Sequence, residues 1–119
     1  MAGDALFIGW GAPVRGREKQ ALQVFQESVQ YWGRLQQEGR IERFDVVQLA
    51  PHGGDLNGFA VLYGERQALA EVRFSEEFER LLVRASAIID APGVTPAYTG
   101  EALGQQMARF QAAAEEFGA

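Results

Sequence analysis

The chain has 119 residues, of which 47% are apolar and 23% charged, a composition typical of a globular protein that forms one domain over residues 1–119. Its net charge of −5 and its scattered basic residues argue against nucleic acid as a partner, because phosphate binding needs clustered Lys and Arg. The absence of cysteine excludes disulfides, thiolate catalysis and cysteine-ligated metal clusters.

The N-terminus shows no sign of export or membrane insertion. Its apolar run, ALFIGW, is short, follows Asp4 and has no basic residue before it. A signal peptide begins with basic residues, and a membrane-spanning helix needs about 20 apolar ones. We therefore expect a cytoplasmic protein with no membrane partner. A single histidine and scattered carboxylates supply no recognised metal-ligand spacing, so we expect no metal and no cofactor.

The first third of the chain predicts a strand followed by a helix. Residues 5–10 are apolar throughout and end at Gly11-Ala12-Pro13, as a strand would. Apolar residues then recur every three or four positions over residues 18–38, which predicts a helix with one apolar stripe: Leu22, Phe25, Val29, Trp32 and Leu35. Gly39 is placed to end this helix. Tyr31 is expected to face away from the stripe and to be partly exposed.

The middle of the chain predicts a hairpin with a long loop. Two β-like runs, residues 44–49 and 59–63, flank a segment rich in Pro, Gly, Asp and Asn. The second run, FAVLY, is apolar at every position apart from a tyrosine hydroxyl, which is typical of a central strand. The loop carries the chain's single histidine, His52.

The last half predicts two helical regions separated by a weak strand. Residues 65–73 form a short helix, and a second stripe runs from Phe74 to Asp90 with Ser75 as its N-cap. Residues 94–99 read as a strand whose Pro96 favours a sheet edge or a bulge. Residues 101–117 predict a further helix with an apolar side composed of Leu103, Met107, Phe110, Ala114 and Phe117.

The resulting order, β-α-β-β-α-β with a C-terminal helix, predicts an α+β ferredoxin-like fold with an antiparallel sheet. Right-handed crossovers place both main helices on one face of that sheet. The strands ALFIGW and FAVLY are nevertheless apolar on both faces, and monomers rarely expose large apolar patches. We therefore expect a homodimer that forms through the open face of the sheet. The alternative is that the C-terminal helix folds back over that face.

The chain resembles the dimeric α/β-barrel superfamily in this order of elements, and GDLNGFAVLYG followed by FSEEFERLL is similar to small uncharacterised bacterial members. Members of that superfamily include cofactor-independent monooxygenases, isomerases and haem-degrading enzymes. The resemblance implies a small homodimeric protein that binds an apolar or aromatic molecule between sheet and helices, with cofactor-independent monooxygenase or isomerase activity. The predicted helices contain no histidine to act as a haem ligand. The alternative function is a non-enzymatic structural or regulatory dimer with a filled cavity.

Four residues are candidates for a site. His52, near Asp55 in the loop, could act as a proton acceptor, unless the loop is only a surface turn. Asn57 could anchor a polar group, unless the Asn57-Gly58 pair simply supplies positive φ. Trp10 and Tyr63 could form the walls of a pocket, unless both are core or interface aromatics.

Overall fold

The structure is a computed structural model that describes residues 3–118, and it has the predicted ferredoxin-like order. Its elements follow one another along the chain as β1 (Asp4–Trp10), α1 (Glu18–Gln37), β2 (Arg43–Gln48), β3 (Gly58–Tyr63), α2 (Arg66–Arg73), α3 (Glu76–Ser86), β4 (Gly93–Tyr98) and α4 (Gly100–Glu116). The strands form an antiparallel sheet in the order β2-β3-β1-β4. The apolar runs β1 and β3 are therefore central, and β4 with its Pro96 is an edge strand, as predicted.

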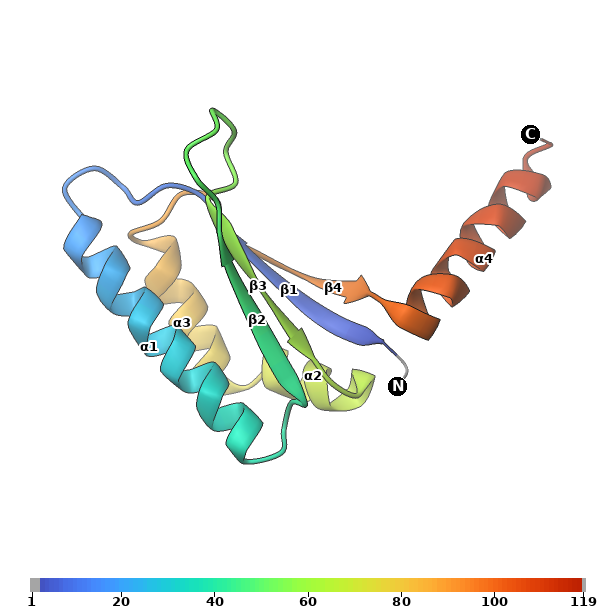
Figure 1. Ribbon diagram of the computed structural model, residues 1–119, viewed down its shortest axis with the longest axis horizontal. Helices are drawn as coiled ribbons and strands as arrows, with labels where there is room; N and C mark the ends of the chain where they lie inside the picture. Colours follow the sequence, from blue (N-terminus) through green and yellow to red (C-terminus); the bar gives the residue numbers. More distant parts are fainter. Residues whose placement is uncertain (1–2, 119) are drawn as a thin grey trace.

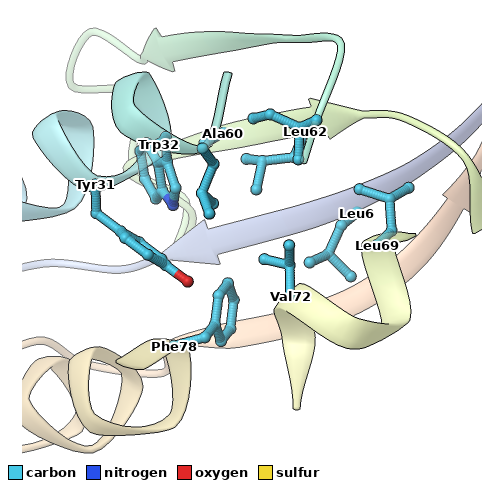
Figure 2. Close-up of a cluster of buried hydrophobic side chains, with 10 residues drawn as sticks. Leu6, Tyr31, Trp32, Ala60, Leu62, Leu69, Val72 and Phe78 are labelled. Carbon is cyan, nitrogen blue, oxygen red and sulfur yellow. The ribbon is translucent and has the colours of Figure 1, made fainter. Parts of the chain in front are cut away.

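The helices α1, α2 and α3 cover one face of the sheet (Figure 1). Alternation along the strands sends Leu6, Ala60 and Leu62 towards these helices, where they are buried. The helices contribute Tyr31, Trp32, Leu69, Val72 and Phe78 to the same core, as Figure 2 shows. Because α2 and α3 both contribute to one cluster, the short break between them bends the chain around the core.

That break is set by Ser75, the predicted N-cap. Its backbone is extended, with φ −70° and ψ 152°, and its Oγ accepts a hydrogen bond from the backbone N–H of Phe78 at 3.3 Å. An oxygen in this position satisfies one of the N–H groups that a helix start leaves free. The predicted helix was too long, however, because it ran to Asp90 whereas α3 ends at Ser86. Ile88 is still buried, but it lies in the turn that follows the helix.

The other face of the sheet carries the second set of apolar side chains. Cross-strand neighbours Phe7 and Val61 point to this face, and the Phe7 and Phe59 rings stack with their centroids 5.4 Å apart. The Arg43 guanidinium lies 3.7 Å from the centre of the Tyr63 ring and binds Asp45 at 2.9 Å on the sheet's edge. This face is therefore an apolar centre with a charged border.

The C-terminal helix α4 does not cover this face. It leaves the end of β4 and projects away from the rest of the chain (Figure 1), with only Ala102 buried. The alternative that this helix folds back over the sheet is therefore wrong for the single protomer. Four helices and a four-stranded sheet account for the described residues, and no described helix is long and apolar enough to cross a bilayer.

Two expectations about α1 are also wrong. Tyr31 is only 4% exposed, whereas Leu22, predicted to face the core, is 57% exposed. The reason is that α1 packs on two surfaces. Trp32 contacts Phe44 of the sheet edge-on, with ring centroids 6.1 Å apart, while the Tyr31 hydroxyl reaches Ser75 Oγ at 3.4 Å beside α3.

Candidate functional site

A cavity of about 410 Å³ lies between the sheet and the helices α1 and α3. Ile8 and Val94 line it from the sheet, Phe25 from α1, and Leu81 and Ala85 from α3. Most of the lining is apolar, and the volume is in the range of small-molecule sites in proteins. The cavity is thus large enough for an aromatic compound of two or three rings.

The cavity exists because the core is divided into two clusters. The main cluster surrounds Leu62, and a smaller one joins Ala21 and Val24 of α1 to Ile88. Side chains of both clusters line the cavity, which occupies the space between them. Leu22 lies among the lining residues and is exposed, so it marks the side on which the cavity meets solvent.

The polar end of the cavity is formed where β1, β2 and β3 meet. Trp10, Gln48 and Gly58 are paired across the three strands, and Asn57 precedes Gly58. A Cβ atom at Gly58 would lie 2.8 Å from Trp10 Nε1 and 2.7 Å from Gln48 Oε1. The glycine therefore allows an indole N–H and an amide to converge above it.

The position of Asn57 is set by backbone hydrogen bonds of the sheet and not by the turn that the sequence suggested. Positive φ occurs at neither Asn57 nor Gly58, so the expectation that this pair supplies positive φ is wrong. The Asn57 backbone is instead part of the sheet's edge network: its N–H donates to the Trp10 carbonyl, and its carbonyl accepts from Leu49 N–H, both at 2.8 Å. Its side-chain amide takes no part in these two bonds, and Asn57 is among the residues that line the cavity.

The other two candidates lie elsewhere. His52 is in the exposed loop, where its Nε2 bonds the Leu56 carbonyl at 2.8 Å and its Nδ1 accepts from Gly54 N–H at 3.3 Å. Both ring nitrogens thus form hydrogen bonds within the loop. Because Nδ1 accepts, the neutral ring carries its proton on Nε2. Tyr63 is on the open face under Arg43. Neither residue lines the cavity, and the role of His52 as proton acceptor stays a prediction.

Charged groups surround the cavity without entering its apolar part. Glu18 is the single carboxylate among the lining residues, at the N-terminus of α1, where it accepts a bond from Gly16 N–H at 3.3 Å. Deeper along α1, Glu27 pairs with Arg84 of α3 and ties the two helices together. The hydrogen bond from Arg84 lowers the pKa of Glu27 below its ordinary value. Within residues 3–118 no group of metal-ligating side chains is found.

The sequence therefore identified two lining residues, Trp10 and Asn57, and missed Phe25, Gln48 and Ala85. The position of Gln48 could have been found from the hairpin register, because it lies opposite Gly58. Phe25 and Ala85 could not be found in this way, since the apolar stripes of α1 and α3 do not reveal where the two helices leave a cavity above the sheet.

No protein-family model matches this chain, and no curated protein matches it significantly in sequence. Solved structures do match. A dabb family protein with a ferredoxin-like fold from Mesorhizobium loti has a TM-score of 0.63 at 5% identity, over 82% of this chain and 98% of its own. A dimeric ferredoxin-like protein of unknown function from Bacteroides fragilis has a TM-score of 0.59 at 10% identity, over 82% and 97%.

A third similar structure is a cofactor-independent oxygenase from Streptomyces nogalater, with a TM-score of 0.57 at 12% identity, over 83% of this chain and 95% of its own. At such low identities the likeness establishes the fold alone, because one fold carries many functions. The predicted ferredoxin-like fold is thereby confirmed.

Proposed function

We propose that this protein is a homodimer that binds a small, planar, largely apolar molecule in the cavity between the sheet and the helices α1 and α3. The observation that carries the proposal is the cavity itself, about 410 Å³ of mostly apolar space with polar groups gathered at one end. A site of this kind binds by burial of apolar surface and selects orientation by a few hydrogen bonds. A purely structural dimer would gain stability by filling such a space.

The polar end selects a ligand with one hydrogen-bonding group. Trp10 places its indole nitrogen at this end beside the Gln48 amide oxygen. Asn57 is a further lining residue, and its side-chain amide carries both donors and an acceptor. Nothing in the apolar part of the lining is positioned to remove a proton, since Glu18 is exposed at the N-terminus of α1. Binding is therefore the primary function that we propose, and a phenol or quinol is the ligand class that fits.

The homodimer is proposed to form through the open face of the sheet. Phe7, Phe59 and Val61 form its apolar centre, and an exposed face of this kind is ordinarily covered. The similar structure from Bacteroides fragilis is a dimeric protein, which supports a dimer here. A face-to-face pair of sheets leaves the cavity of each protomer on the outer side, so each copy would bind its own ligand.

Binding is tested by calorimetric titration with 1-naphthol, a planar apolar probe with one hydroxyl. We expect a dissociation constant on the order of 10–100 μM, as is usual for a well-fitted ligand of this size. Ala85→Trp places an indole in the cavity and should abolish binding. Val83→Trp is the matched control, because Val83 is on the same helix but 68% exposed. Equal affinities for the two variants would refute the proposed site.

The polar end has a test of its own. Asn57→Leu removes the side-chain amide and leaves the backbone hydrogen bonds of Asn57 in place. We expect this change to weaken 1-naphthol about two- to tenfold, the value of one hydrogen bond, and to leave naphthalene unaffected. A loss of affinity for both probes would mean that Asn57 shapes the cavity rather than recognising the hydroxyl.

A second candidate function is cofactor-independent oxygenation of the bound molecule. It is favoured by the shared fold with the oxygenase from Streptomyces nogalater. If it is correct, the protein should accelerate oxygen consumption by 1,4-dihydroxynaphthalene, and Ala85→Trp should remove the acceleration. Binding of 1-naphthol with no acceleration would leave the binding function alone.

A further inference from the structure

The C-terminal helix α4 carries an apolar stripe that no part of the chain within residues 3–118 covers. Leu103, Met107 and Phe110 are 47%, 55% and 71% exposed. With Ala114 they recur at intervals of four, three and four residues, and Phe117 at the helix end, 84% exposed, extends the series. This spacing places them on one side of the helix, in the pattern of helices that pack lengthwise against another surface.

The position of α4 is fixed by its junction with the sheet. The backbone N–H and the Oγ1 hydroxyl of Thr99 both donate to the Gly3 carbonyl at 2.7 Å, and Ala102 is buried at the base of the helix. From there the helix extends outward, away from α1 and α3 (Figure 1). The radius of gyration is 16.2 Å, whereas a compact chain of this length has about 13–14 Å.

A second copy of the chain is the partner that these observations favour. On the open face of the sheet, the side chains of Phe7, Phe59, Val61 and Tyr63 are already half-buried within the protomer. A stable dimer buries about 800 Å² on each partner. The four large side chains of α4, which are 47–84% exposed, would add apolar surface to that of the sheet. An arm that projects from the edge strand can reach past a second sheet packed on the open face.

The charge of α4 argues against a lipid surface. The helix carries three glutamates, Glu101, Glu115 and Glu116, and one arginine, Arg109. Helices that lie on membranes are rich in Lys and Arg on the polar face, because cellular membranes are anionic. An acidic polar face suits a soluble assembly instead.

We propose that α4 is an exchanged arm: in the homodimer the stripe Leu103–Met107–Phe110–Phe117 of each copy packs on the partner copy, reciprocally about the two-fold axis. This inference rests on the proposed homodimer and adds that the dimer is held by α4 as well as by the sheet. The arm explains why a helix that buries only Ala102 within its own protomer retains a regular apolar side.

Single-cysteine labelling tests the arm directly, because the natural chain has no cysteine. Met107→Cys places the thiol on the stripe, and Ala112→Cys places it on the opposite side of the same helix. At concentrations where the protein is dimeric, we expect iodoacetamide to modify the Met107→Cys thiol at least about tenfold more slowly, since thiol modification depends on access. The protection should disappear on dilution to the monomer, which a fold-back within one chain would not do.

A charge on the stripe gives an independent measurement. Phe110→Glu should raise the dimer dissociation constant by roughly 10- to 100-fold, because an apolar ring is lost in each copy, while Ala112→Glu should leave it unchanged. Equal thiol reactivity of the two cysteines and an unchanged dissociation constant for Phe110→Glu would overturn the arm.

Three further outcomes separate the possibilities. Protection that appears only when phosphatidylglycerol vesicles are added would overturn the arm in favour of a lipid surface. An unmodified protein that is monomeric at every concentration would overturn the arm and the proposed dimer together, and binding of 1-naphthol would still be measured on the monomer. If Phe110→Glu remained dimeric with an unchanged dimer dissociation constant, the arm would be wrong and the proposed function would stand.

Discussion

Replacing Val61 with glutamate should convert the dimer into a folded monomer. Val61 is on β3, paired with Phe7 of β1 and Asp45 of β2, and it points to the open face at the centre of the proposed interface. Burial of an unpaired carboxylate costs several kcal/mol, and a two-fold axis introduces two of them. We expect the dimer dissociation constant to rise by at least about a thousandfold.

The fold should tolerate the same change. In the separated protomer the glutamate would be half-exposed, with Asp45 as its cross-strand neighbour. Like charges in such a pair destabilise a sheet by about 0.2–1 kcal/mol, so the melting temperature should fall by only a few degrees. Sedimentation velocity reports the mass, and far-ultraviolet circular dichroism reports the fold.

Val61→Thr is the matched control for this experiment, because threonine has the shape of valine and no charge. It should remain dimeric with a modest loss of affinity. If Val61→Glu were folded and still dimeric, the two copies would have to meet elsewhere than on the open face. The proposed dimer and the exchanged arm would then both need another interface.

The sequence predicted the sheet well because its signals are local. The unbroken apolar run FAVLY, the proline in β4 and the serine before α3 each act within a few residues, and each has the expected role in the structure. Two-sided apolarity of β1 and β3 also identified the central strands. These are features that backbone geometry imposes on neighbouring residues.

The site was predicted only in part because it depends on distant contacts. Trp10 and Asn57 were found from their places at strand ends. The role of Gly58 could not be found, since it reflects the closeness of Trp10 and Gln48 on two other strands rather than a backbone angle. Tyr31 was misplaced for the same reason: a stripe of one helix does not reveal that a second helix lies beside it.

The placement of α4 shows a further limit. Its stripe predicts that something covers the helix, and the sequence offered the helix's own sheet as one candidate. The hydrogen bonds of Thr99 to Gly3 instead direct α4 away from that sheet. The direction in which a helix leaves a sheet is decided by two or three hydrogen bonds between residues far apart in sequence. The spacing of apolar residues along the helix does not reveal these bonds.

Leu62→Ala should produce the largest loss of stability within one protomer. Leu62 is the neighbour of Val61 on β3 but faces the helices, with 0% exposure and with Leu6 and Phe44 as its cross-strand neighbours. Removing a leucine side chain from such a position costs about 2–5 kcal/mol, part of it for the cavity left behind. That is a large share of the roughly 5–15 kcal/mol that stabilises a typical domain.

The measurement is best made in the monomeric Val61→Glu background, where the free energy of unfolding in urea does not depend on protein concentration. Leu62→Met is the control, because a swap of similar volume costs less than about 1.5 kcal/mol. Leu62→Ala should also leave the dimer dissociation constant unchanged when Val61 is retained and the protein is folded. The reason is that the side chain at position 62 points away from the open face. Two adjacent residues would then separate the two roles of one strand: Val61 controls assembly and Leu62 controls folding. A loss below about 1 kcal/mol for Leu62→Ala would contradict this division, because it would mean that the helix face of β3 is not tightly packed.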